Sequence, residues 1–386
     1  MATREARTEV TDARAARYHR IQLTLRVVGF GLGVGYLALV LAAGAGHGLA
    51  QRLGAWPWWI QVAGVAAVLA VGHRLLLAPL TWVRGWWLPR RYGLLHQPIG
   101  AWLIDQGKAG VLGAVLGLAA ITLIYGLLRA LPSWWWLAAS AAFLALYVAM
   151  AVVVPVWIVP LFYRMTPLAD EALRARLLAL AARTGVPAIG VWVVDQSRKS
   201  RAANAAVVGL GHTRRILLFD TILDFAPREL EAVLAHELGH HARHDVWRGL
   251  CVQIVVTLVG FAVADVVLAR GATWLGLNGI ADPAGVPWLA LVLGAVGLLA
   301  LPLTNAYSRT LERAADDFAL RTTDDVEGFV DAMERLAVRN LAKRRPHWLV
   351  EFLLYSHPSI ERRVARARAW AQSHPRHQYS AIAADS

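Results

Sequence analysis

Two histidines and a glutamate within five residues have the types and spacing needed to bind a metal ion and activate water. They stand in the segment His236-Glu237-Leu238-Gly239-His240. On a helix, residues four apart lie one turn above each other on the same face, so both imidazoles can reach one metal ion. The carboxylate between them points beside that ion, where it can act as a general base. This H-E-x-x-H pattern therefore indicates metal-assisted hydrolysis.

A catalytic zinc site usually has three protein ligands and leaves a fourth position for water. The chain has a single cysteine, Cys251, so the third ligand must be a histidine or a carboxylate. We favour Glu312, which follows the last apolar run of the chain. His241 and His244 are alternatives, and His244 is the stronger because it lies one further turn along the same helix face. Asp316, one turn beyond Glu312, can accept a hydrogen bond from a ligating imidazole.

These residues predict a mechanism for peptide hydrolysis. One zinc ion per chain would lower the pKa of water to about 7 and polarise the scissile carbonyl. Glu237 would take the water proton and return it to the leaving amine. A solvated helix face can carry the same five residues by chance. The nearby membrane span and the E-x-x-x-D pattern on a second helix favour the metal site.

The elements that must position these residues are mostly membrane helices. Of 386 residues, 57% are hydrophobic and only 17% are charged, with a mean hydropathy of +0.46. Six apolar runs are long enough to cross a bilayer: about 21–43, 58–82, 110–131, 134–158, 249–269 and 286–306. Tryptophans cluster at the ends of several runs, as in an aromatic belt. We predict a mainly α, polytopic integral membrane protein of about six spans, with a zincin-like catalytic region and a small β-hairpin.

The net charge of +13 indicates topology rather than nucleic-acid binding. Basic residues precede the first span, separate spans two and three, and fill the segment between spans four and five. The other connections carry almost none. We therefore expect the termini and the 160–247 region to be cytoplasmic, in a bacterial plasma membrane. The polar start is too long to resemble a cleaved signal peptide. We expect no nucleic-acid partner, only the lipid bilayer and a peptide or protein substrate.

The alternation of apolar and polar segments predicts six regions along the chain. They are a cytoplasmic segment (1–20), a four-span membrane region (21–159), a first catalytic part with the H-E-x-x-H pattern (160–248), a two-span hairpin (249–306), a second catalytic part with the third zinc ligand (307–372) and a flexible tail (373–386). The catalytic unit is thus expected in two halves, separated by a membrane hairpin.

Local patterns predict the elements around the motif. Asp170–Thr184 has helical spacing, Ile189–Val194 reads as a strand, and Ala205–Gly209 with Arg215–Phe219 reads as a hairpin. A helix should begin at Pro227, carry both motif histidines and continue towards or into the fifth span. Asp265 is a lone acid in that span, which marks either a functional site or the outer interface.

Beyond these patterns, the chain resembles the M48 peptidases, and within them the Ste24-like type 1 CAAX prenyl proteases, from about Arg84 onward. The matching segments are the H-E-x-x-H motif, Val159–Phe162 with Thr166–Leu168, Asn204–Gly209 followed by Arg215–Thr221, Ser308-Arg309 with Glu312 and Asp316, and Tyr355–Pro358 with Glu361-Arg362. Together these motifs are highly specific.

The resemblance implies a helical membrane chamber with a zinc site at its cytoplasmic side. It implies a zinc metalloendopeptidase acting on membrane-associated or lipid-modified peptides or proteins, in which Asn204 and His357 bind the substrate backbone or the tetrahedral intermediate. Eukaryotic members have seven spans, whereas six are predicted here.

Three other functions compete with this one. A quality-control protease like HtpX usually has fewer spans before the motif. A signalling receptor like BlaR needs an extracellular ligand domain, for which no segment is long enough. A transporter with a structural metal would not need Glu237.

Overall fold

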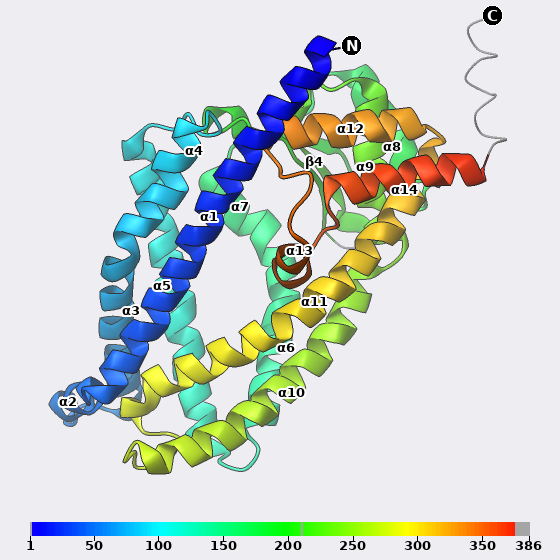
Figure 1. Ribbon diagram of the computed structural model, residues 1–386. Helices are drawn as coiled ribbons and strands as arrows, with labels where there is room; N and C mark the ends of the chain where they lie inside the picture. The colour runs from blue at the N-terminus through cyan, green and yellow to red at the C-terminus, as the bar shows by residue number, and fades with distance from the viewer. Residues whose placement is uncertain (1, 210, 375–386) are drawn as a thin grey trace, which may run out of the picture.

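The computed structural model describes residues 2–209 and 211–374, and the protein is mainly helical (Figure 1). A small sheet and several shorter helices lie at one end of a set of long helices. This is the mainly α membrane architecture that the sequence predicts. The predicted flexible tail, 373–386, lies outside the described residues except for its first two positions.

Six helices in the described part of the chain are long and apolar enough to cross a membrane, which confirms the predicted number. They are α1 (Ala2–Ala42), α3 (Trp58–Trp82), α5 (Ile99–Ala130), α6 (Trp135–Val153), α10 (Asp245–Trp274) and α11 (Val286–Thr323). Two continue through π-helical turns, α3 through η1 (Val83–Trp87) into α4 (Leu88–Arg91), and α6 through η2 (Val154–Ile158) into α7 (Val159–Phe162). A short α2 (Ala45–Arg52) joins the first two spans.

The long helices reach well beyond their apolar parts. The apolar run in α11 ends near residue 306, but the helix continues to Thr323. Its last turns therefore leave the predicted hydrocarbon region and carry Glu312 and Asp316 into the catalytic part. Thus α11 links the membrane region directly to the residues predicted as metal ligands.

At the opposite end, buried polar contacts hold the membrane helices together. The Trp135 indole nitrogen donates to an Asp265 carboxylate oxygen at 2.5 Å, joining α6 to α10. The Tyr125 hydroxyl donates to the Asp282 carbonyl oxygen at 3.2 Å. Asp265 thus has a hydrogen-bond partner at the start of α6, and its two interpretations stay predictions.

The small sheet has four strands, β1 (Met165–Pro167), β2 (Val191–Val194), β3 (Ala205–Val208) and β4 (Arg215–Phe219), in the order β1-β2-β4-β3. The antiparallel pair β3–β4 is the predicted hairpin. The parallel pair β2–β4 and the short β1 were not predicted. The predicted helix at 170–184 is α8 (Glu171–Arg183), capped by the Asp170 carboxylate, which accepts from the Leu173 amide at 2.9 Å.

Four helices lie at the same end as the sheet: α9 (Pro227–Ala242), α12 (Val326–Arg339), α13 (Trp348–Leu354) and α14 (Ile360–Ser373). They lie with the sheet and the end of α11 on one side of the molecule (Figure 1). Buried apolar side chains of α9, such as Leu234 and Leu238, share a core with Leu218 of β4 and Phe329 of α12. This core fixes α9, which carries the motif histidines.

The motif helix was expected to continue towards or into the fifth span, and it runs towards that span without entering it. Helix α9 ends at Ala242, and His244 adopts a left-handed conformation with φ 57°. Helix α10 then begins at Asp245. A residue with positive φ cannot continue an α-helix. The break separates the motif helix from the membrane span and places an acid in the first turn of α10.

Candidate metal centre

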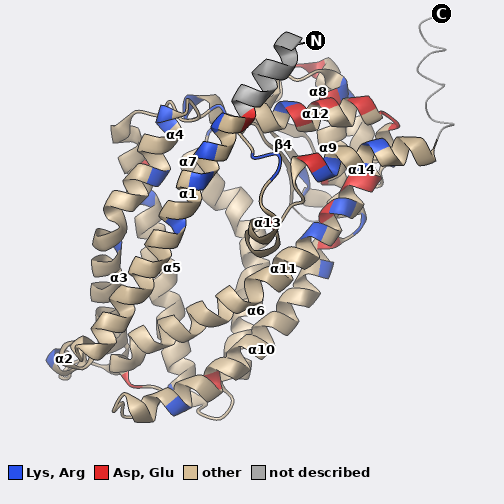
Figure 2. Ribbon diagram, viewed as in Figure 1, with Lys and Arg blue, Asp and Glu red and all other residues tan. Residues whose placement is uncertain are grey.

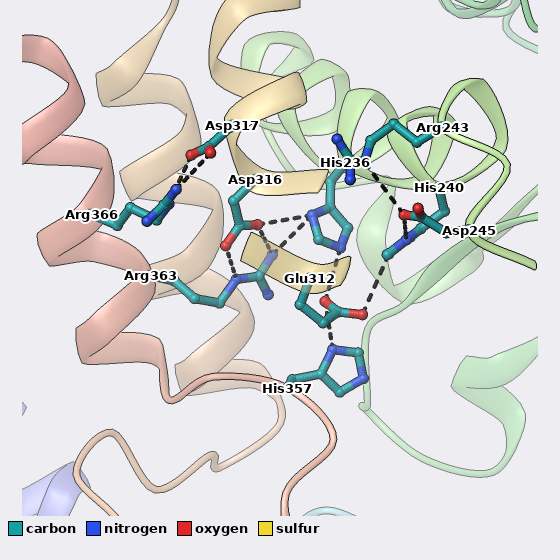
Figure 3. Close-up of polar contacts among 10 residues, drawn as sticks. All are labelled: His236, His240, Arg243, Asp245, Glu312, Asp316, Asp317, His357, Arg363 and Arg366. Carbon is teal, nitrogen blue, oxygen red and sulfur yellow. Dashed lines mark hydrogen bonds and ion pairs between the residues drawn. The ribbon is translucent and has the colours of Figure 1, made fainter. Parts of the chain in front are cut away.

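Two helices bring the three predicted ligands together. His236 and His240 lie on α9, and Glu312 lies on α11 (Figure 3). One possible ligand atom from each residue lies within 4.8 Å of the others. The Nε2 atoms of His236 and His240 are 3.3 and 3.4 Å from the two Glu312 carboxylate oxygens. Both imidazoles therefore turn the same ring nitrogen towards one carboxylate.

A glycine allows the two helices to approach this closely. A Cβ atom at Gly239 would lie 3.1 Å from a ring carbon of Phe318 on α11, closer than ordinary van der Waals contact. Glycine is suited to such a crossing because it has no side chain. The variable third and fourth positions of the motif are thus Leu238, which packs into the core, and Gly239, which contacts α11.

A carboxylate stands behind each imidazole. The Nδ1 atom of His236 is 2.8 Å from an Asp316 oxygen, and the Nδ1 atom of His240 is 3.1 Å from an Asp245 oxygen. An imidazole that donates from Nδ1 presents the Nε2 lone pair to a metal. The sequence predicted this place for Asp316. It did not identify Asp245, which follows the unpredicted break between α9 and α10.

Arg363 of α14 orients Asp316 in turn. Its Nε atom donates to one Asp316 oxygen at 2.9 Å, and an Nη atom donates to the other at 2.5 Å. The same Nη atom lies 3.2 Å from Nδ1 of His236. Because the guanidinium and a protonated Nδ1 are both donors, the carboxylate accepts from each. The sequence pattern stopped at Glu361-Arg362, one residue short of this arginine.

The surrounding acids also favour protonated imidazoles before a metal binds. Burial and the charge of Arg363 lower the pKa of His236, but its contacts with Asp316 and Glu312 outweigh them and raise it to about 9. Burial likewise opposes the charged form of His240, whereas Glu312 raises its pKa overall. Since metal ligands must be deprotonated, metal uptake at this site should release protons.

The Glu312 carboxylate fits a cation. It is only 5% exposed, and its Oε2 atom makes no hydrogen bond of good geometry although ring nitrogens lie close to it. A buried carboxylate oxygen left this way is costly. A cation between the carboxylate and the two imidazoles would offset that cost. Two imidazoles and one carboxylate are also a donor set that suits zinc.

His357 reaches the same carboxylate from the C-terminal part of the chain. Its Nδ1 atom is 2.7 Å from Oε2 of Glu312, while its side chain is 61% exposed. Glu237 is half-buried on α9 and has no hydrogen-bond or ion-pair partner among the described residues. Asn204 is exposed just before β3, where its side-chain oxygen accepts from the Ala205 amide at 3.0 Å. The structure thus places His357 beside the cluster formed by His236, His240 and Glu312. Among the described residues, the Asn204 side chain makes no hydrogen bond to that cluster.

The two rival ligands lie elsewhere. The Nε2 atom of His241 donates to the Val207 carbonyl oxygen at 2.9 Å, towards β3. Burial lowers the pKa of His241, which favours the neutral donor form. His244 lies at the break between α9 and α10 and is not part of the cluster.

Helix α11 also holds the segment that carries His357. An Nη atom of Arg309 donates to the carbonyl oxygens of Glu351 at 3.1 Å and Tyr355 at 2.6 Å, at the end of α13. Asn305 donates to the Leu353 carbonyl oxygen at 2.8 Å. The Leu353 and Tyr355 carbonyls lie at the end of α13, where a helix leaves its carbonyls without intrahelical partners, whereas the Glu351 carbonyl also accepts from the Tyr355 amide at 3.2 Å. The helix that carries Glu312 therefore also fixes the approach to His357.

Comparison with known proteins places the chain in a family. The model of peptidase family M48 matches residues 167–371, more than half of the chain. A second model, the CAAX prenyl protease N-terminal region with five membrane helices, matches residues 5–164. The described chain has four candidate spans in that range, not five.

Curated relatives and a solved structure agree with these matches. An uncharacterized metalloprotease of Bacillus subtilis, YhfN, is 30% identical over 83% of this chain and 76% of its own length. CAAX prenyl protease 1 of Saccharomyces cerevisiae is 27% identical over 74% of this chain and 67% of its own. The crystal structure of S. mikatae Ste24p has the same fold, with a TM-score of 0.82, 21% identity, and coverage of 92% of this chain and 89% of that one. The chain therefore belongs to peptidase family M48, as a membrane metalloprotease of its Ste24-like branch.

Proposed function

We propose that the protein is a membrane-embedded zinc metalloendopeptidase in which His236, His240 and Glu312 hold one zinc ion. The observation that carries this proposal is the convergence of the three ligand atoms within 4.8 Å. Each imidazole also has a carboxylate at its other nitrogen. That arrangement is expected of ligating histidines and fixes the required tautomer.

The side chains around the cluster can divide the chemistry between them. Zinc, when bound, would polarise the scissile carbonyl and lower the pKa of water. Glu237 lies next to a ligand and is free of other partners, so it can take the water proton and return it to the leaving amine. His357 is largely exposed beside Glu312 and can donate to the oxyanion. The Asn204 amide is exposed and can bind the substrate backbone.

The substrates proposed are membrane-associated or lipid-modified peptides and proteins. Glu312 lies on α11, the last of the six candidate spans, so a substrate anchored in the bilayer would have its scissile bond close to the cluster. Relatives named CAAX prenyl protease 1 support the same class. Four spans precede the motif, which favours this layout over that of an HtpX-like quality-control protease.

The active site is proposed to face the cytoplasm of a bacterium. Lysine and arginine gather at the end of the molecule that carries the sheet and α9, and few lie at the other end (Figure 2). Positive residues are enriched on the cytoplasmic side of membrane proteins.

Replacing the proposed base tests this function. Glu237→Gln should lower hydrolysis of a prenylated C-terminal peptide by about 10²–10⁴-fold, because the water proton loses its acceptor. Zinc content, measured on the same preparation, should not change. The matched control is Glu231→Gln on the same helix, whose native carboxylate pairs with Arg176 away from the cluster, and it should retain both. Full hydrolysis by zinc-loaded Glu237→Gln would reject the proposed role.

A further inference from the structure

A cavity of about 770 Å³ lies among the membrane helices, separate from the metal cluster. Its walls come from α1 (positions 29–37), from α3 and η1 (73–84), from α10 and from the first turns of α11 (288–299). All of these segments belong to candidate membrane spans. Glycine and aliphatic side chains make up most of the lining, and no acidic residue is among them.

One charged side chain, Arg84, enters this apolar lining. Its Nε atom is buried and has no hydrogen-bond partner, and Arg84 makes no ion pair with any described residue. An arginine at the end of a span can lay its apolar stem along the membrane helices and hold its guanidinium at the level of the lipid headgroups. The arginine lies in η1, at the end of the second span nearest the catalytic region (Figure 1).

A second arginine adds positive charge at the same end. The Gln22 side chain of α1 donates to the Arg84 carbonyl oxygen at 3.1 Å, which fixes α1 against η1. Arg26 lies one turn beyond Gln22 on the same face, is exposed, and acts electrostatically on Arg84. Because Arg26 adds to the positive charge near Arg84 and no acidic residue lines the cavity, an anion is favoured at Arg84.

The other polar groups of the lining do not supply that anion. His73 is packed between the first two spans, with its ring 5.9 Å from that of Tyr36. A Cβ atom at Gly33 would lie 2.8 Å from its Nε2 atom, so the ring fills the space beside α1. Thr81 and the indole of Trp288 carry no charge.

We propose that this cavity binds one anionic phospholipid from the leaflet nearest the metal centre, with its phosphate at Arg84 and an acyl chain between α1, α3 and α11. The planar guanidinium donates well to phosphate oxygens. The apolar walls of the cavity exclude water from the acyl chain of the lipid. Neither contact involves the metal ligands, so the site is distinct from the proposed peptidase centre.

Two pairs of variants separate the headgroup contact from the cavity. Arg84→Gln removes the charge, and its control is Arg20→Gln, an exposed arginine on the same side of the membrane. Gly294→Leu fills the cavity, because a Cβ atom there meets nothing within 4 Å and the residue lines the cavity. Gly297→Leu makes the same change three residues on, also in open space but outside the lining.

The measurement is native mass spectrometry of the full-length protein from nanodiscs with equal amounts of phosphatidylglycerol and phosphatidylcholine. The wild type, Arg20→Gln and Gly297→Leu should each retain one phosphatidylglycerol, with about tenfold preference over phosphatidylcholine. Arg84→Gln should lose the preference, and Gly294→Leu should lose the bound lipid. Ala290→Phe, which fills the cavity from another position, replaces Gly294→Leu if that variant does not elute as a folded species.

Three results would overturn the proposal. One is equal retention of both lipids by the wild type, and another is no retained lipid. The third is a bound lipid that a prenylated peptide displaces one for one, which would assign the cavity to the substrate.

Discussion

At the scale of single residues, we expect the acids behind the two imidazoles to govern how firmly the proposed zinc ion is held. Asp316 receives a hydrogen bond from His236 and two from Arg363. Asp245 receives one from His240 at the start of α10. Because each acid fixes a ring orientation, its loss should weaken the metal site without removing a ligand.

Asp316→Asn and Asp245→Asn should each lower zinc affinity by about 10–100-fold, since an amide stabilises the donating imidazole less than a carboxylate does. Competition with a fluorescent zinc chelator measures the change. Asp317→Asn is the control, because the Asp317 carboxylate is next to Asp316 in the chain but pairs with Arg366 at the surface. Zinc affinity as high in Asp316→Asn as in Asp317→Asn would show that the acid does not support the site.

Much of the proposed ligand set could be predicted from the sequence because helical spacing is regular. Four-residue spacing places His236 over His240, and the same spacing places Glu312 over Asp316. Asp245 could not be found this way, since it follows a break caused by the left-handed His244. Arg363 lies far along the chain from the histidine it approaches, and no local period links the two.

At the scale of elements, α11 carries Glu312 and also contacts the segment before His357. Arg309 is 9% exposed and lies on α11, three residues before Glu312. Its guanidinium donates to carbonyl oxygens at the end of α13. Nearby, the buried Glu351 carboxylate accepts from the Ser359 amide at 3.1 Å, which closes the loop on its other side. We infer that Arg309 is a positioning residue that acts through His357.

Arg309→Ala should lower kcat by about 10²-fold with little change in KM, because a displaced His357 affects the reaction more than binding. The readout is a double-mutant cycle with His357→Ala in the peptide assay. If the arginine acts through the histidine, the double variant should be no slower than the worse single variant.

Arg313→Ala, an exposed arginine one turn on, serves as the control and should behave as wild type. If the fold-loss of kcat in the double variant equals the product of the two single losses, Arg309 acts independently of His357. Partial recovery of kcat in Arg309→Lys, which keeps one charged donor nitrogen for the carbonyls, would agree with the positioning role.

The sequence predicted single elements better than their arrangement. Capping by Asp170 and the proline at the start of α9 mark helix ends locally, and both helices were anticipated. The parallel pairing of β2 with β4 depends on contacts between separate segments. Strand β1 is three residues long and includes Pro167, which carries little strand signal.

At the scale of the whole molecule, apolar length alone was enough to predict six spans. Each run is set by the thickness of the bilayer, so its signal is local. How the spans pack is not local, and neither the cavity beside Arg84 nor the contact of Asp265 with Trp135 could be derived from hydropathy. Sidedness rests on the uneven distribution of basic residues.

Cysteine labelling in intact bacterial cells checks this sidedness. In a Cys251→Ser background, Gln51→Cys lies on the short α2 and should react with a membrane-impermeant maleimide. Gln372→Cys, exposed on α14, should react only after permeabilisation. Both positions are exposed, so their reactivity compares the two sides of the membrane. The reverse pattern would place the catalytic end outside.

Zinc content of the purified protein tests the central claim most directly. We expect one zinc per chain in the wild type and in His244→Ala, and none in His236→Ala, His240→Ala or Glu312→Ala, measured by inductively coupled plasma mass spectrometry on folded material. Loss of zinc from His244→Ala with retention in Glu312→Ala would contradict the proposed ligand set.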